Sequence, residues 1–151
     1  MKPGEGTIRY LRLRADTLMG MFRRLEEPAR SQAFAALARS TAEHGGDSAR
    51  RYLEAGGGDA TALLAMIEKT AAELGWGEWQ FGAPGAAPLA LEVKDSPFAQ
   101  GHGAADAPVC SPIAGMLEAV AGLALGAPCE AREIACRACG AATCRFEALR
   151  K

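Results

Sequence analysis

The sequence has little of the features that mark several specialised classes of protein. Only 23% of its residues are charged, and 17 Lys and Arg nearly balance 18 Asp and Glu, which leaves a formal net charge of -1. Such a chain offers no strong positive field for a nucleic-acid backbone. A hydrophobic share of 49% also argues against a disordered or fibrous chain. The composition therefore favours a globular protein that does not bind nucleic acid.

A long uninterrupted hydrophobic run is also missing. The most apolar stretch, Val109 to Ala127, contains Pro112 and Glu118, whereas a helix that crosses a bilayer needs about 20 predominantly apolar residues. The start, Met-Lys-Pro-Gly-Glu-Gly, is not followed by the apolar core of a secretory signal. We therefore expect a cytoplasmic protein without a membrane span.

The length of 151 residues suits one domain, and no repeat or flexible linker divides the chain. A chain of this size can bury roughly 68 to 70% of the surface that its unfolded form exposes. We expect residues 1–151 to form a single domain with one core.

Apolar residues at three- and four-residue spacings predict helices in the first half of the chain. The expected helices begin near Asp16, at Pro28, near Asp47 and after Asp59, which is a plausible N-cap. Glycines are expected to end them, at Gly45-Gly46 for the second, at Gly56 for the short third and at Gly75 for the fourth.

Two pairs of strands are predicted in the second half. Trp76 to Phe81 and Leu89 to Val93 form the first pair, and Cys129 to Cys136 and Thr143 to Leu149 form the second around a turn at Gly140. Between them, Ser96 to Ala107 is expected to be a connection, followed by a helix from about Cys110 to Gly126. This order predicts an α+β fold with N-terminal helices packed on a twisted antiparallel sheet.

Cysteines are few but unevenly spaced. Three of the five lie within nine residues, at Cys136, Cys139 and Cys144. In a reducing compartment an odd set is better explained by thiols or metal ligands than by disulfides. We interpret Cys129, in the middle of a predicted strand, as ordinary packing.

Zinc usually takes four ligands in a tetrahedron, and a hairpin can supply several of them. Cys110 stands at a helix start, where the pKa of a thiol is lowered, and Glu133 precedes the hairpin turn. Cys139 forms a Cys-x2-Cys pair with Cys136 and could take the place of Glu133. With four protein ligands such a site is closed, so we expect a structural rather than a catalytic metal.

Three motifs resemble those of the 4-vinyl-reductase, or hydrocarbon-binding, domain family. They are Asp95-Ser96-Pro97-Phe98-Ala99, Pro108-Val109-Cys110 with the following Gly115, and Glu133-x2-Cys136-x-Ala138-x-Gly140-x3-Cys144-x-Phe146. The resemblance implies that Cys110, Glu133, Cys136 and Cys144 hold zinc and staple the C-terminal hairpin. It also implies a fold related to the small subunits of the TRAPP tether, which are commonly dimeric, so we expect a homodimer that pairs through helices.

The same resemblance implies a small apolar ligand, either an aromatic, a hydrocarbon or a tetrapyrrole, bound by a sensor or an accessory carrier. Aromatic and apolar residues could line a pocket between the central helix and the sheet, with a histidine as a polar contact. These residues are Met66, Trp76, Trp79, Phe81, Phe98 and His102. The alternative interpretation is that the aromatics are ordinary core.

Catalysis is not favoured by the sequence. Gly56-Gly57-Gly58 lacks the spacing and the preceding strand of a dinucleotide-binding turn, and no Ser, His and Asp constellation is legible among Ser96, His44 and His102. Two alternatives to a ligand-binding domain stay open. One is a protein–protein interaction module with a purely structural zinc, and the other is an accessory protein or reductase of (bacterio)chlorophyll biosynthesis.

Overall fold

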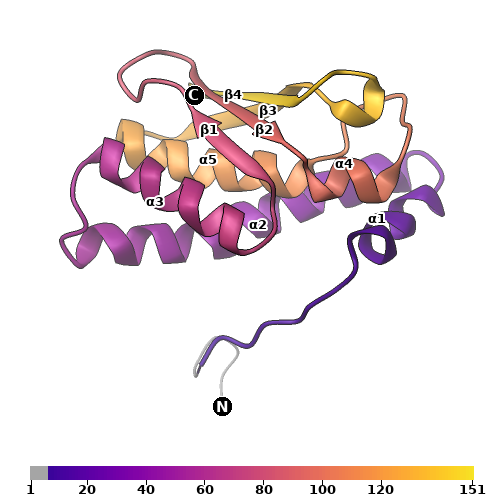
Figure 1. Ribbon diagram of the computed structural model, residues 1–151, viewed down its shortest axis with the longest axis horizontal. Coiled ribbons are helices and arrows are strands. Elements are labelled where there is room, and N and C mark those ends of the chain that lie inside the picture. Colours follow the sequence, from indigo (N-terminus) through magenta and orange to yellow (C-terminus); the bar gives the residue numbers. More distant parts are fainter. Residues whose placement is uncertain (1–6) are drawn as a thin grey trace.

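The structure is a computed structural model that describes residues 7–151. Residues 1–6, which led us to expect no secretory signal, lie outside the described part. The elements in chain order are α1 (Ala15–Arg23), α2 (Ala29–Glu54), α3 (Ala60–Glu73), β1 (Glu78–Phe81), β2 (Leu89–Lys94), α4 (Pro97–His102), α5 (Ser111–Leu125), β3 (Cys129–Ala135), a 3-10 turn (Arg137–Cys139) and β4 (Cys144–Arg150). The helices gather on one side of a sheet (Figure 1).

The four strands form one antiparallel sheet in the order β1-β2-β4-β3. The two predicted hairpins therefore join side by side through β2 and β4, where Leu91 pairs with Phe146. Alternate residues of β2 are buried, as expected for a strand with one face on the core. The predicted α+β fold with an antiparallel sheet is confirmed.

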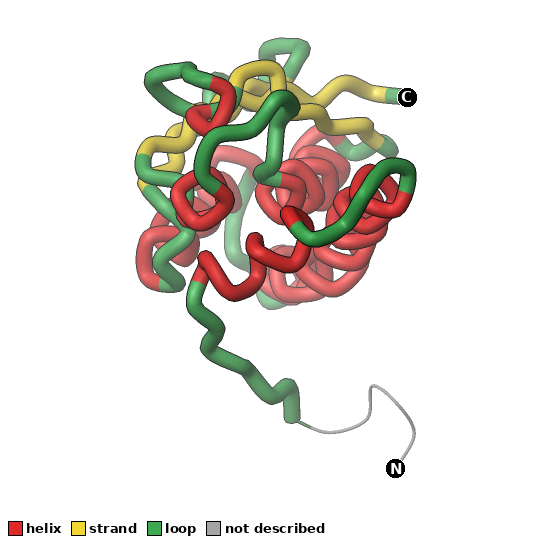
Figure 2. The backbone as a smooth tube through the Cα atoms, turned by 90° about the vertical axis from the view of Figure 1, so that its right-hand side faces the viewer, coloured by secondary structure: helices red, strands yellow, loops and turns green. Residues whose placement is uncertain are grey.

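Helix α5 lies directly against the sheet, and α2 packs on the other side of α5 (Figures 1 and 2). Ile113, Leu117 and Val120 of α5 are fully buried in the core. Gly126 ends the helix in the left-handed region, with φ of 66°, where glycine carries no steric penalty. The predicted end of this helix is correct.

Helix α2 is one continuous helix of 26 residues, so the prediction that Gly45-Gly46 ends a helix was wrong, as was the separate short helix from Asp47. The reason is a close crossing with α5. A Cβ atom at Gly46 would lie 3.2 Å from the Ala119 Cβ, and one at Gly45 would overlap the Met116 side chain. The glycines therefore bring two helices together and do not act as a stop signal.

Helix α4 was not predicted, because Ser96 to Ala107 was expected to be a connection. Ser96 caps this short helix by accepting a hydrogen bond from the Ala99 N–H at 3.3 Å, and Pro97 occupies the first turn. Ser followed by Pro is a usual helix start. The helix fixes Ser96 beside the first cysteine of the candidate site.

Residues 7–14 run away from the body of the protein (Figures 1 and 2). Four large apolar side chains of this segment are exposed, namely Ile8, Tyr10, Leu11 and Leu13. Within residues 7–151, no helix combines the length and the apolarity that crossing a membrane requires.

Candidate functional site

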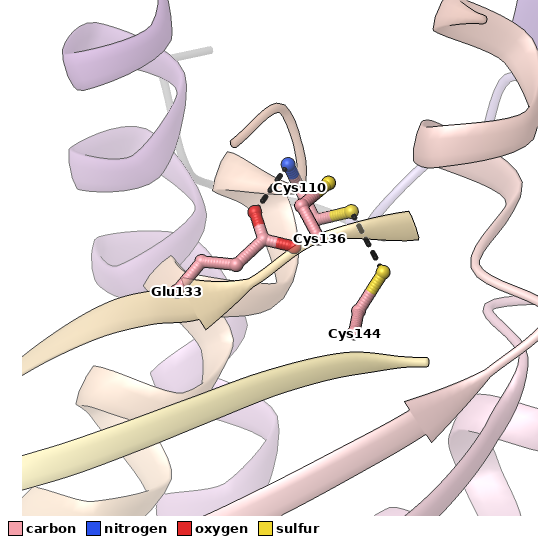
Figure 3. Close-up of side chains that lie close together, drawn as sticks. All are labelled: Cys110, Glu133, Cys136 and Cys144. Carbon is pink, nitrogen blue, oxygen red and sulfur yellow. Dashed lines mark hydrogen bonds between the residues drawn. The ribbon is translucent and has the colours of Figure 1, made fainter. Parts of the chain in front are cut away.

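Cys110, Glu133, Cys136 and Cys144 come together in the structure, and we refer to them as the four-residue cluster. One ligand atom from each lies within 4.8 Å of those of the other three. Figure 3 shows the four side chains converging from the start of α5, from β3, from the turn after β3 and from the start of β4. Of the residues considered for the metal, this set contains Glu133 and leaves out Cys139.

Local backbone features aim these side chains at one point. Cys110 is the N-cap residue of α5. The pairing of β3 with β4 changes register between Glu133 and Ala135, and a bulge of this kind redirects side chains. Gly140 then turns the chain with φ of 102°, a conformation that favours glycine.

The three thiols of the cluster are shielded from solvent, and Glu133 is half-buried. Cys110, Cys136 and Cys144 expose at most 2% of their surface. The Cys110 N–H donates a hydrogen bond to Glu133 Oε1 at 2.9 Å, and the Arg137 N–H lies 3.4 Å from Cys144 Sγ. Cys110 Sγ is 3.8 Å from Cys144 Sγ and 3.1 Å from Ser96 Oγ.

One oxygen of the cluster has no partner. Glu133 Oε2 is buried and makes no hydrogen bond with any described residue. A buried acceptor without a partner costs free energy, and a carboxylate usually meets this need by pairing or by coordinating a metal. The unpartnered oxygen of Glu133 is therefore available to a metal ion, which these residues could hold.

The electrostatics of the cluster lead to the same inference. Burial, with the neighbouring Cys136 charge, raises the pKa of Glu133 to about 8. Hydrogen bonding with Cys136 and Cys144 and burial raise the pKa of Cys110, whereas hydrogen bonding with Cys110 and Cys144 lowers that of Cys136. A hydrogen bond with Cys110 lowers the pKa of Cys144, but Cys136 and burial outweigh it and raise that pKa to about 12. Without a cation, most of these groups would keep their protons.

Three thiols and one carboxylate could hold a metal ion, and this donor set suits zinc, which binds Cys sulfur and carboxylate oxygen in four-coordinate structural sites. Cys139 lies on the exposed side of the 3-10 turn, outside the cluster. Cys129 is buried at the far end of β3, where its thiol is 3.3 Å from the Ala127 carbonyl oxygen.

The residues expected to line a ligand pocket lie in two separate places: the aromatic residues pack together, and His102 lies apart from them. Trp76, Trp79, Phe81 and Phe98 form an aromatic cluster in which Trp76 meets Phe98 edge-on at 5.0 Å, and Trp79 meets Phe81 in the same way at 6.0 Å. Such contacts are typical of a packed aromatic core. Met66 is partly buried at the edge of this core.

A small cavity of about 50 Å³ adjoins the aromatic cluster. It is lined by Ile67, Thr70, Ala71, Leu74, Trp76, Trp79 and Met116. An engineered cavity that binds benzene has a volume of about 150 Å³, so an aromatic ligand would enter this smaller cavity by moving side chains. Ile67, Ala71 and Leu74 are apolar residues of the helix expected after Asp59, and Met116 belongs to the helix expected from about Cys110 to Gly126. None of these four residues, nor Thr70, was predicted to line a ligand cavity.

His102 lies apart from that cavity. It borders a groove of about 740 Å³ between the first two helices and the loop before α5, together with Phe34 and Asp106. Its Nδ1 is 3.2 Å from the Gly103 carbonyl oxygen. The structure therefore does not bring His102 to the same space as Trp79.

Comparison with known proteins identifies the C-terminal part of the chain. Residues 89–150 match the family model of the 4-vinyl-reductase domain. The resemblance to this family is thus shown over these residues. All of the four-residue cluster lies within the matched segment.

Two solved structures share the fold. One is the phenol-responsive sensory domain of the transcription activator PoxR with phenol, at 20% identity and a TM-score of 0.76, covering 93% of this chain and 76% of that one. The other is a vinyl-4-reductase family protein from Methanocaldococcus jannaschii, at 14% identity and a TM-score of 0.57, covering 89% and 88%. No curated protein sequence gives a significant match.

Proposed function

We propose that the protein is a non-catalytic domain that binds a small apolar molecule and is stabilised by zinc in the four-residue cluster. The observation that carries the metal assignment is the convergence of three buried thiols and a carboxylate with an unpartnered oxygen. The zinc supplies positive charge to buried acidic groups and links α5 to the C-terminal hairpin. Four protein ligands leave no position for a reacting water, so the role is structural.

Ligand binding is supported by the match to the 4-vinyl-reductase domain and by the likeness in fold to a phenol-responsive sensory domain. The place we propose is the cavity beside Trp76 and Trp79. Met116 lines it, and an unbranched thioether side chain adapts readily to a new neighbour. An aromatic, a hydrocarbon or the edge of a tetrapyrrole would enlarge the cavity by displacing Met116 and Trp76, which are only partly buried. The protein would then act as a sensor or an accessory carrier.

Tryptophan emission tests this proposal directly. Binding beside Trp76 and Trp79 should shift or quench the emission of the zinc-loaded protein and raise its melting temperature. Phenols, aromatic hydrocarbons and porphyrins form a suitable panel. Trp79→Phe leaves Trp76 as the only tryptophan beside the cavity and should reduce the emission change while retaining binding by calorimetry. If the whole panel leaves emission and melting temperature unchanged, the ligand-binding proposal fails.

A second candidate is a protein–protein interaction module with a structural zinc. The observation that favours it is the exposure of Ile8, Tyr10, Leu11 and Leu13 on a segment that leaves the body. Exposed apolar groups of this kind mark interaction sites. Failure of the ligand panel, together with a stable complex that depends on this segment, would favour the module.

A further inference from the structure

The groove of about 740 Å³ beside His102 has no part in the function proposed above. It lies between α1, the start of α2 and the loop of residues 103–109, at the end of the molecule where α1 and α4 pack together (Figure 1). Pockets for small molecules usually have volumes of about 300 to 1,000 Å³. This space, which we call the His102 groove, is therefore large enough for a ring-sized ligand as it stands.

Hydrogen bonds hold two walls of the His102 groove in place. The Ala105 N–H donates to the Ala138 carbonyl oxygen at 2.9 Å, which ties the loop to the turn after β3. The Arg23 guanidinium donates to the His102 carbonyl oxygen at 3.4 Å, which ties the loop to α1. A ligand that enters a groove with fixed walls loses little affinity to ordering them.

Arg30 brings a half-buried positive charge to the groove from the first turn of α2. Its Nε donates to the Leu25 carbonyl oxygen at 2.9 Å, which orients the guanidinium without neutralising it. Arg30 forms no ion pair with any residue from 7 to 151. The first turn of α2 has no acidic residue and no side-chain cap, and a helix N-terminus carries partial positive charge. These features favour a planar anion such as a carboxylate, which a guanidinium can bind through two hydrogen bonds.

An aromatic surface lies one helical turn further along α2. Phe34 stands four residues after Arg30, so both side chains share one face of the helix. The Phe34 ring centre lies 6.4 Å from that of His102, and the buried side chain of Val109 also lines the groove. A ligand ring would therefore find apolar contacts close to the cation.

His102 adds a hydrogen-bonding atom to this surface. Its side chain is buried, and its Nδ1 lies 3.2 Å from the Gly103 carbonyl oxygen. Because a carbonyl oxygen can only accept, we assign the hydrogen to Nδ1, which leaves Nε2 of the neutral ring as an acceptor. A hydroxyl group on a bound ring can donate to Nε2.

The groove also contains two carboxylates, which act against an anion. Glu27 and Asp106 are both exposed, and Glu27 accepts a hydrogen bond from the Ser31 hydroxyl. Arg23 lines the same groove and adds a second positive charge. Solvent and salt screen exposed charges more than half-buried ones. The charge of Arg30 therefore has the larger effect on a ligand that reaches Phe34.

We propose that the His102 groove binds a small aromatic carboxylate. The carboxylate pairs with Arg30, the ring lies against Phe34 and Val109, and a ring hydroxyl donates to His102 Nε2. This site is separate from the cavity beside Trp79, and it depends neither on the proposed zinc nor on the proposed apolar ligand.

The test uses three probes that share one ring and differ in charge, namely 4-hydroxyphenylacetate, its methyl ester and tyramine. Calorimetry should show the acid binding at least about tenfold more tightly than the ester or the amine, a difference of about 1.4 kcal/mol. Arg30→Met should abolish this preference for the acid. Arg39→Met, which removes an exposed arginine of α2 outside the groove, should bind the acid like the wild type.

Two further variants assign the position of the ring. His102→Phe keeps a ring but loses Nε2, so it should weaken binding of 4-hydroxyphenylacetate and leave that of phenylacetate unchanged. Trp79→Phe should leave binding of both acids unchanged, and a loss of binding in that variant would move the acid to the cavity beside Trp79 and overturn the proposal. Failure of the acid to bind at millimolar concentration, a preference for tyramine, or wild-type binding by Arg30→Met would also overturn it. None of these results bears on the zinc or on the apolar ligand of the proposed function.

Discussion

At the scale of single residues, Glu133 brings a carboxylate into a buried position among three thiols. Its pKa in the metal-free fold rises from 4.5 to about 8 because of burial and the Cys136 charge. The folded protein then holds this proton more tightly than the unfolded chain does. The group therefore stabilises the metal-free fold below about pH 4.5, and this contribution is lost as the pH rises to about 8.

We predict that zinc removes this dependence, because the ion takes the place of the proton. Denaturant unfolding across this range should show the metal-free wild type losing stability relative to metal-free Glu133→Gln as the pH rises. The comparison with Glu133→Gln isolates the carboxyl group, because the lowered pKa of Cys136 contributes in the opposite direction in both proteins. A difference between the two proteins that does not change with pH, or that grows in favour of the wild type as the pH rises, would contradict this account.

The ligand residues differ in what their loss should do. Cys136→Ser and Cys144→Ser should lose zinc and most of the stability of the C-terminal hairpin, because metal-binding energy is folding energy. Glu133→Gln should weaken zinc retention against a chelator by at least the roughly 10- to 100-fold that loss of an outer-shell partner costs. Cys129→Ser and Cys139→Ser should retain zinc at equilibrium. Greater loss from Cys139→Ser than from Glu133→Gln would reverse our assignment of the fourth ligand.

At the scale of elements, the crossing of α2 and α5 depends on small residues. A Cβ atom at Gly115 would overlap the backbone carbonyl of Ala38, which cannot move aside. Gly115→Ala should therefore destabilise the protein by about 1 to 3 kcal/mol or more, the usual cost of overpacking. Urea denaturation measures this difference.

Gly45→Ala is the matched control for that crossing. Its new methyl group would meet the end of the Met116 side chain, which is flexible. It also gains about 1 kcal/mol of helix propensity, so its net effect should be small. An equal loss of stability in the two variants would mean that backbone contact does not limit this crossing.

The elements also show what the sequence could and could not predict. The alternation in Leu89, Leu91 and Val93 and the glycine stop at Gly126 have local causes, so this strand and the end of α5 were predicted correctly. Gly45 and Gly46 were misread because their role depends on α5, which lies far away in the sequence. Ser96-Pro97 carried a local helix signal that we did not use.

At the candidate site, too, some features could be predicted from the sequence and others could not. The resemblance to the 4-vinyl-reductase family implied the members of the four-residue cluster, whereas the spacing of the cysteines alone left Cys139 and Glu133 as alternatives. The spacing could not reveal the unpartnered oxygen of Glu133, which depends on where Cys110 places its N–H. The sequence correctly predicted that the aromatic residues near Trp79 lie together. It could not show whether their side chains pack against one another or leave a cavity for a ligand. His102 was placed with them although only its neighbour in the chain, Phe98, packs there.

At the scale of the whole molecule, we predict a homodimer in which residues 7–14 take part. Four large apolar side chains of this segment are exposed in the single chain, and α1 directs it away from the body. Leu11→Glu would place a charge among them and should shift sedimentation at micromolar concentration from dimer towards monomer, with zinc retained. Arg9→Glu, a charge change in the same segment, serves as a control for general electrostatic effects. A wild-type protein that sediments only as a monomer would contradict the prediction.

The most direct measurement for the central claim is the metal content of protein purified without chelator, by native mass spectrometry. The account predicts one zinc ion per chain, absent from Cys144→Ser and retained in Cys129→Ser. It predicts further that loss of the ion lowers the melting temperature of the wild type. A folded wild-type protein that carries no metal, and that does not gain stability when zinc is added, would contradict the account.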